Sequence, residues 1–121
     1  MKVIIAGSRT FNDFKLLREK MDKILSRVKN DEEIIIFSGT AQGADKLGEA
    51  YAQANNYVIK RYPADWDTFG KSAGYRRNEQ MAEDADALVA FWDGESKGTA
   101  HMIDTMAAMD KPVRVIRFER S

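Results

Sequence analysis

The chain has 121 residues, with 19 basic and 19 acidic side chains and no cysteine. This length suits one domain, which we expect over residues 1–121, and the charge balance disfavours a general nucleic-acid coat. The lack of cysteine excludes disulfides and thiolate metal sites, and the apolar run at residues 3–6 is too short for a signal peptide or membrane span, so we expect a cytoplasmic protein.

Apolar, β-branched runs alternate with helical patterns along the chain. The alternation predicts an α/β fold, a Rossmann-like three-layer sandwich around a five-stranded parallel sheet. Right-handed crossovers favour the strand order 3-2-1-4-5. In chain order we expect a strand over 2–6, a helix over 13–29 capped by Asn12 or Asp13, a strand over 34–37, a helix over 45–55, a strand over 57–61, an irregular segment over 63–74, a helix over 74–84, a strand over 87–91, a loop over 92–97, a helix over 99–109 and a strand over 113–116.

Three loops that follow predicted strands combine glycine with small hydroxyl residues. They are GSRTF at 7–11, SGTAQGAD at 38–45 and WDGESKGT at 92–99. In this strand order ligands bind beyond the carboxyl ends of the first and fourth strands, where the winding reverses. Glycine allows close backbone approach, and helix N-termini attract phosphate. We therefore expect Gly7, Gly39 and Gly98 to line one anion-binding crevice.

The candidate ligand-binding residues of these loops are Gly7, Ser8, Arg9, Ser38, Gly39, Gly43, Asp45, Asp93, Gly94, Ser96, Lys97, Gly98 and Thr99. Each loop taken alone fits an ordinary turn equally well. Arg9 either grips phosphate or forms a surface salt bridge, and Asp45 either binds a ribose or caps a helix. The loops lack the Lys-Ser/Thr ending of a P-loop and the GxGxxG fingerprint, which argues against a standard NTPase or dinucleotide site.

Further candidates lie outside these loops. Asp65 and Trp66 fall in the irregular segment, where Trp66 either stacks on a base or packs beneath the loop. Arg77 and Asn78 either face the site or belong to a solvated helix face. His101 is the only histidine, so an acid–base role is open but a metal site is not indicated. We predict no metal and no cofactor.

Four stretches of the chain resemble a known family. GSRTF, SGTAQGADKLGEAYA, YPADWDTFGKSAGYRRNEQM and ADALVAFWDGESKGTAHMI are similar, in order, to the YspA-like (cpYpsA-related) branch of the SLOG superfamily, which includes DprA and the LOG (lysine decarboxylase-like) proteins. The resemblance implies a Rossmann-like fold and binding of a nucleotide or nucleotide-derived phosphate ligand, as a sensor or sequestering module. It also implies a homodimer or higher homo-oligomer.

LOG enzymes cleave the N-glycosidic bond of nucleoside monophosphates, using an Arg-Lys-x-x-Met helix and a PGGxGTxxE motif. By this resemblance Arg77 falls on the catalytic arginine and residues 94–99 on the glycine motif, but the glutamate falls on Met102. Methionine can neither stabilise a cationic sugar nor activate water. N-glycosidic hydrolysis is thus an alternative, with Arg77 and Asp45 as catalytic candidates.

Two alternatives remain open. Asp65 or Asp93 are other carboxylates that would replace the missing glutamate. A DprA-like association with DNA is a third function, which the neutral net charge argues against.

Overall fold

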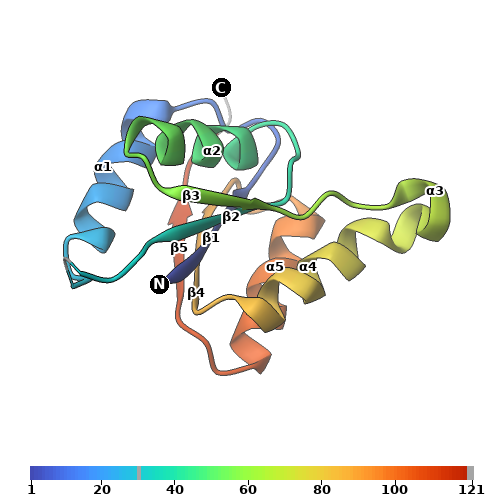
Figure 1. The fold of residues 1–121 in the computed structure, drawn as a ribbon. Helices are drawn as coiled ribbons and strands as arrows, with labels where there is room; N and C mark the ends of the chain where they lie inside the picture. The colour runs from blue at the N-terminus through green and yellow to red at the C-terminus, as the bar shows by residue number, and fades with distance from the viewer. Residues whose placement is uncertain (30, 120–121) are drawn as a thin grey trace.

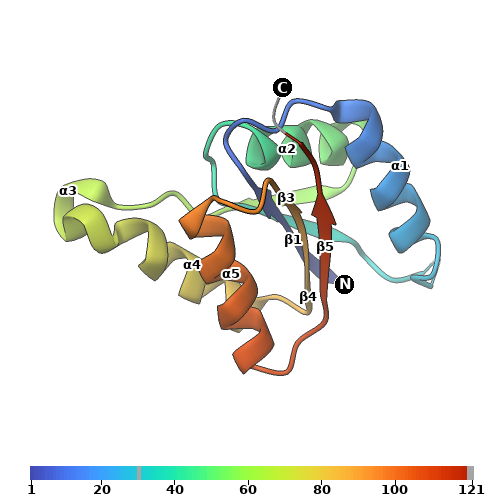
Figure 2. The same ribbon diagram turned by 180° about the vertical axis from the view of Figure 1, so that it is seen from behind.

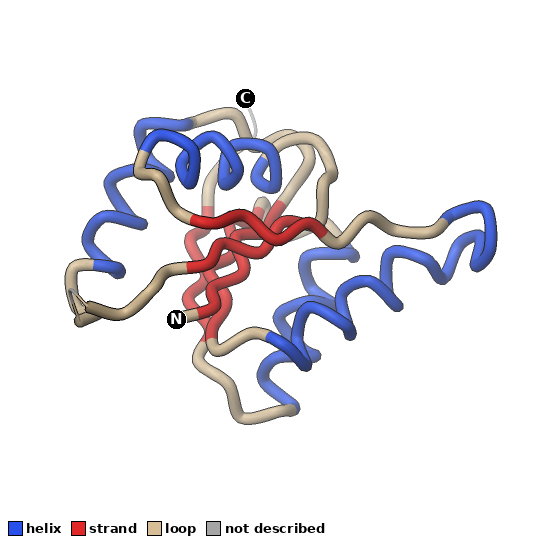
Figure 3. Tube along the Cα trace, viewed as in Figure 1, coloured by secondary structure: helices blue, strands red, loops and turns tan. Residues whose placement is uncertain are grey.

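Helices and strands alternate along the chain, as the sequence pattern predicts. The computed structural model describes residues 1–29 and 31–119, and it forms three layers with the sheet in the middle (Figure 1, Figure 3). The elements are β1 (Lys2–Gly7), α1 (Phe14–Leu25), β2 (Ile35–Ser38), α2 (Ala44–Ala54), β3 (Val58–Arg61), α3 (Trp66–Phe69), the 3₁₀ turn η1 (Gly70–Ser72), α4 (Ala73–Asp84), β4 (Ala87–Trp92), α5 (Lys97–Ala108) and β5 (Val113–Arg117).

The sheet has the predicted order β3-β2-β1-β4-β5, and every strand pair is parallel. This confirms the expected fold class. β1 lies at the centre, where Ile4 pairs with Phe37 of β2 on one side and with Leu88 of β4 on the other. The chain winds outward from β1 to β3 and then returns to start the other half at β4. The winding therefore reverses between β1 and β4, which is where an open parallel sheet binds ligands.

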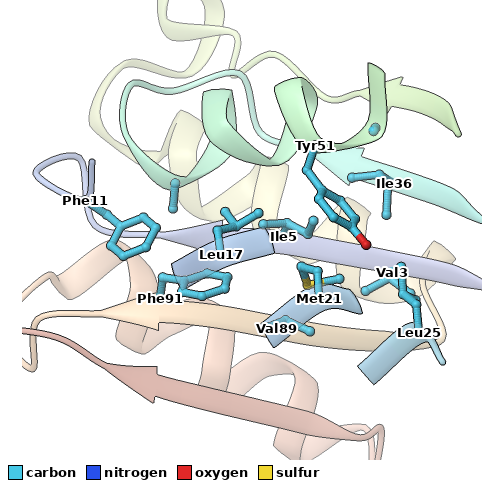
Figure 4. Close-up of a cluster of buried hydrophobic side chains, with 12 residues drawn as sticks. Val3, Ile5, Phe11, Leu17, Met21, Leu25, Ile36, Tyr51, Val89 and Phe91 are labelled. Carbon is cyan, nitrogen blue, oxygen red and sulfur yellow. The ribbon is translucent and has the colours of Figure 1, made fainter. Parts of the chain in front are cut away.

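Alternate side chains of β1 enter the two halves of the core. Val3 and Ile5 pack with residues of α1 and α2, including Leu17 and Tyr51 (Figure 4). Ile4 and Ala6 enter a second cluster, on the face covered by α4 and α5 (Figure 2). A strand that is buried on both faces reads as a continuous apolar run, which explains the composition of residues 3–6.

The first helix is shorter than its apolar pattern predicts. Asp13 is the N-cap, accepting a hydrogen bond from the backbone N–H of Leu16 at 3.0 Å. The helix ends at Leu25 and not at residue 29, because Ser26 caps its C-terminus and donates its hydroxyl to the Lys23 carbonyl at 2.6 Å. Hydroxyl groups that bond to nearby carbonyls compete with helix continuation.

The segment over 63–74 is not irregular throughout, and this expectation was wrong. It contains α3 and η1. These two elements extend beyond the sheet and are called the arm below (Figure 1, Figure 2). The carboxylate of Asp65 accepts a hydrogen bond from the Thr68 N–H at 3.1 Å and so starts α3. Similarly, α5 starts at Lys97 and not at Thr99, because Ser96 caps it. No described helix is long and apolar enough to cross a membrane.

Candidate functional site

A cavity of about 490 Å³ opens at the carboxyl edge of the sheet, where the winding reverses. Its lining comes from the loops after β1, β2 and β4, the starts of α2 and α5, the short helix α3 and one side of α4. A cavity of this size is in the range of small-molecule sites. It brings together these predicted residues: Gly7, Ser8, Arg9, Asp45, Trp66, Arg77, Asn78, Asp93, Ser96, Gly98 and Thr99.

The loops after β1 and β4 are locked to each other beneath the cavity. The Ser8 N–H donates to the Phe91 carbonyl at 2.9 Å, and the Asp93 N–H donates to the Ser8 hydroxyl at 3.1 Å. A Cβ on Gly7 would collide with the same Phe91 carbonyl oxygen, so only glycine lets the two chains approach. This fixes the floor of the site before any ligand arrives.

The first turn of α5 forms one wall. Ser96 caps the helix, and its hydroxyl oxygen accepts hydrogen bonds from the Thr99 N–H at 3.4 Å and the Thr99 hydroxyl at 3.1 Å. The Asp93 carboxylate orients the turn by accepting the Ser96 N–H at 2.9 Å. A Cβ added to Gly98 would meet no atom within 4 Å, so this residue borders open space. The partial positive charge of a helix start favours an anion there.

Arg77 projects from α4 and is anchored at two points. Its Nε donates to the Asn78 side-chain oxygen at 3.0 Å, and its Nη1 donates to the Gly39 carbonyl. Burial lowers the pKa of Arg77, Asp45 opposes this shift and Arg9 adds to it. An arginine remains charged in proteins despite such a shift. The anchors therefore hold a partly desolvated positive charge at the cavity.

Asn78 connects this arginine to α5. Its side-chain N–H₂ lies 3.2 Å from the Gly98 carbonyl and 3.2 Å from Nδ1 of His101. His101 itself lies outside the cavity lining, with its ring packed on Tyr75 at a centroid distance of 4.5 Å and its Nε2 4.0 Å from Glu79. His101 therefore contacts Asn78, which lines the cavity, but does not line the cavity itself.

Asp45 lies at the base of the cavity, in the first turn of α2, whose N-cap is Gly43. The residue is 5% exposed, and its Oδ2 accepts the Ala41 N–H at 3.0 Å. Burial raises the pKa of Asp45 to about 6, although the Ala41 hydrogen bond, Arg77 and Arg9 oppose the shift. A carboxyl group with a strongly raised pKa in a cleft is typical of functional sites.

Asp45 and Arg77 face each other across Gly39 without forming a salt bridge. The salt bridges of the described residues include neither of them, and they also omit Arg9. A Cβ on Gly39 would lie 2.8 Å from Asp45 Oδ2 and 2.8 Å from Arg77 Nη1. Gly39 does not line the cavity. Because it has no side chain, it leaves room for the Asp45 carboxylate and the Arg77 guanidinium.

An aromatic wall closes the side of the cavity toward the arm. Trp66 is 51% exposed, and its ring lies against Gly74, where a Cβ would be 3.3 Å from Cη2. Tyr75 and Lys71 line the same side. Trp66 therefore neither packs beneath the loop nor lies clear of the site, but presents much of its surface at the opening.

Six predicted ligand residues lie outside the lining: Ser38, Gly39, Gly43, Asp65, Gly94 and Lys97. Asp65 caps α3, and Gly94 packs against Arg117. Lys97 is exposed at the start of α5. These positions have the composition of a ligand loop, yet the structure gives several of them internal partners.

Ser38 is the clearest example of a predicted ligand residue that bonds to other protein groups instead. It is fully buried, its hydroxyl donates to Glu49 at 2.6 Å, and the same oxygen accepts the Thr40 N–H at 3.1 Å. Arg61 also donates to Glu49, at 3.0 Å. Burial raises the pKa of Glu49, but the hydrogen bonds from Ser38 and Arg61 outweigh it, and the net shift is downward. Ser38 therefore stabilises the packing of α2 on the sheet.

Sequence reasoning missed part of the lining: Ala6, Thr10, Ala41, Lys71, Gly74, Tyr75, Met81, Glu95 and Met102. Lys71, Gly74 and Tyr75 lie in the stretch between Trp66 and Arg77, and the alternation of small, aromatic and basic residues there was the available signal. Met81 and Met102 are core residues whose side chains also reach the cavity. Among the described residues, no group of three His, Asp or Glu side chains is placed to hold a metal ion.

Comparison with known proteins identifies the family of this chain. The model of the YspA, cpYpsA-related SLOG family matches residues 1–69. The chain is also 32% identical over 106 residues to the Gene 61 protein of Mycobacterium phage D29, covering 83% of each. No solved structure matches. The matched segment contains the loops after β1 and β2, and membership suggests a nucleotide-related ligand. This chain belongs to the YspA, cpYpsA-related SLOG family.

Proposed function

We propose that this protein binds a nucleotide or nucleotide-derived phosphate ligand in the cavity between β1 and β4, acting as a sensor or a sequestering module. One observation carries the proposal: the cavity joins an uncovered helix start, two arginines without salt-bridge partners among the described residues, and an exposed aromatic side chain. Phosphate, sugar and base each have a suitable surface there.

The phosphate fits best at the α5 end of the cavity. Gly98 leaves space for it, and the helix start attracts its charge. Arg9, on the loop after β1, adds a full positive charge to the cavity lining, close enough to Asp45 and Arg77 to act on both. Arginine presents several donors in a planar fork, which matches phosphate geometry.

The base fits best on the side of the cavity toward the arm, against the exposed ring of Trp66. Stacking on an aromatic side chain contributes roughly 1–3 kcal/mol per base and tolerates any base. The sugar then lies between the two ends, next to Asp45 and Arg77.

Isothermal titration against nucleoside monophosphates and diphosphates, ADP-ribose and NAD tests this function. We expect saturable binding of at least one of them, weakened by Arg9→Ala because the phosphate loses a charged partner. Lys15→Ala, which changes an exposed cation on α1, is the matched control and should leave affinity unchanged. Failure of every ligand to bind at millimolar concentration would contradict the proposal.

N-glycosidic hydrolysis is a second candidate, and the position of Asp45 favours it. Of the carboxylates considered as replacements for the missing glutamate, Asp65 caps α3, and Asp93 lines the cavity but accepts hydrogen bonds from the Glu95 and Ser96 N–H groups. Asp45 lines the cavity, and its pKa is raised to about 6. A carboxylate there would stabilise positive charge on the sugar or accept a proton from water, and Arg77 would hold the phosphate or the departing group.

Release of free base from nucleoside monophosphates measures this activity directly. We expect Arg77→Ala and Asp45→Asn each to abolish it, whereas Asp65→Asn preserves the α3 cap and should leave it unchanged. Binding without any base release would leave the protein as a sensor or sequestering module.

A further inference from the structure

Asp45 keeps one carboxylate oxygen without a protein partner. Oδ2 accepts the Ala41 N–H, but none of the hydrogen bonds of the described residues reaches Oδ1. No fully buried side-chain oxygen or nitrogen among those residues lacks a partner, so Oδ1 keeps some access to solvent. Because Asp45 is 5% exposed and lines the cavity, that access is through the cavity.

The neighbouring Arg77 does not supply the missing hydrogen bond to Asp45 Oδ1. Arg77 is tied to the Gly39 carbonyl and to Asn78, and it forms no salt bridge with Asp45. Asp45 is tied in turn to the loop residue Ala41. Both ends of the pair are therefore held by groups that a ligand does not need to displace. A desolvated carboxylate oxygen in this position needs a hydrogen-bond donor from elsewhere.

The donor must come from the middle of the ligand. In the proposed arrangement the phosphate lies at α5 and the base lies at Trp66, so the sugar lies beside Asp45. Phosphate oxygens at neutral pH are mainly acceptors, whereas a ribose carries hydroxyl donors. We propose, as a deepening of the function proposed above, that Asp45 accepts a hydrogen bond from a ribose hydroxyl, so that the site selects ribonucleotides over nucleotides whose sugar lacks that hydroxyl.

The test compares matched ligands that differ by one hydroxyl. AMP, 2′-deoxy-AMP and 3′-deoxy-AMP are titrated into the whole protein at pH 8, followed by the same trios built on guanine, cytosine and uracil. We expect one of the deoxy forms to bind at least about tenfold more weakly than its ribonucleotide, the factor typical of losing a hydrogen bond to a charged group.

Variants show whether Asp45 causes the preference. Asp45→Ala should bring the ribose and deoxyribose affinities to within about twofold, because no acceptor remains. If this variant does not fold, Asp45→Asn keeps the shape and a weaker acceptor and should reduce the preference severalfold. Asp104→Asn changes an exposed carboxylate on α5 and should preserve the full preference.

The pH dependence of the preference separates ligand binding from a structural role. The charged groups that act on Asp45 are Arg77 from α4, Arg9 from the loop after β1 and Glu49 from α2 itself. Protonation of the Asp45 carboxyl weakens it as an acceptor, so the ribose preference should fall between pH 8 and pH 5. The ligand phosphate titrates equally in both members of a pair and cancels from the ratio. Asp45→Asn should show a flat ratio.

Each outcome has one meaning. If no nucleoside monophosphate binds but a nucleoside diphosphate, ADP-ribose or NAD does, the proposed function stands and this inference is overturned; if none of these ligands binds, both fail. If ribonucleotides and both deoxy forms bind equally, ligand binding stands and the role of Asp45 is wrong. If Asp45→Ala keeps the preference, another residue recognises the sugar and the inference is equally overturned.

Discussion

The loops after β2 and β4 have similar compositions but face different surroundings. Each combines glycine with a hydroxyl residue and leads into a helix. After β2, the Ser38 hydroxyl donates to the buried Glu49, and a Cβ on Gly39 would meet Arg77 and Asp45. After β4, Ser96 caps α5, and a Cβ on Gly98 would meet nothing within 4 Å.

A glycine and a hydroxyl group therefore do not identify a ligand loop by themselves. The loop after β2 holds the protein together and positions Asp45 and Arg77, whereas the start of α5 remains open to the cavity. What separates the two is the set of partners that each polar group finds in the folded chain. Four substitutions test the distinction.

The largest expected effect is the pH-dependent stability that Asp45 contributes. Its folded pKa of about 6 exceeds the ordinary value of 3.8, so between these values the folded protein binds a proton that the unfolded chain has lost. Stability from this group is therefore present at low pH and lost as pH rises through that window, by about 3 kcal/mol in total. Urea unfolding should show Asp45→Asn gaining this amount relative to wild type between pH 4 and pH 7.

A stability difference that stays constant across this range would show that the Asp45 pKa is not raised. It would also remove the main support for a special environment at the base of the cavity. Asp104→Asn, on an exposed position, should give a constant difference and serves as the control.

Ser38→Ala should lower the free energy of unfolding by about 2 kcal/mol, because a buried carboxylate loses a donor. The loss should be measured by urea unfolding at pH 7, together with ligand affinity. We expect affinity to stay within about twofold, since Ser38 lies outside the cavity lining. A large loss of affinity with intact folding would mean that Ser38 itself contributes to ligand binding.

Gly98→Ala should weaken nucleotide binding by about tenfold, comparable to removing one good phosphate contact. The added methyl group enters open space at the cavity, so the protein should stay as stable as the wild type. Isothermal titration and thermal unfolding together measure the two effects. Unchanged affinity for every nucleotide would place the phosphate somewhere other than the start of α5.

The smallest effect is expected for His101→Gln. His101 lies behind Asn78 and outside the cavity lining, so binding and any base release should change by less than about twofold. Kinetic and titration measurements on the purified variant check this. A loss of turnover with unchanged affinity would instead identify His101 as an acid–base group and extend the site beyond its lining.

Much of the fold was predictable, because buried strands and amphipathic helices leave strong patterns. The β-branched run at residues 3–6, ended by Gly7, predicted a buried strand, and the alternation along the chain led to the correct strand order. The arm was missed because α3 is a single short turn, set by one capping bond from Asp65 to Thr68. Such a turn has too few residues to show a helical period.

The α/β architecture, the reversal between β1 and β4, and the edge of the sheet where glycine-containing loops gather all follow from the amino-acid sequence. Hydrophobic periodicity and loop composition are local properties, and they are enough for that. Three features are visible only in the folded chain: Ser38 bonds to Glu49, Gly98 borders open space, and Asp45 keeps an oxygen toward the cavity. These facts depend on which distant groups become neighbours, and that information arises only when the chain folds.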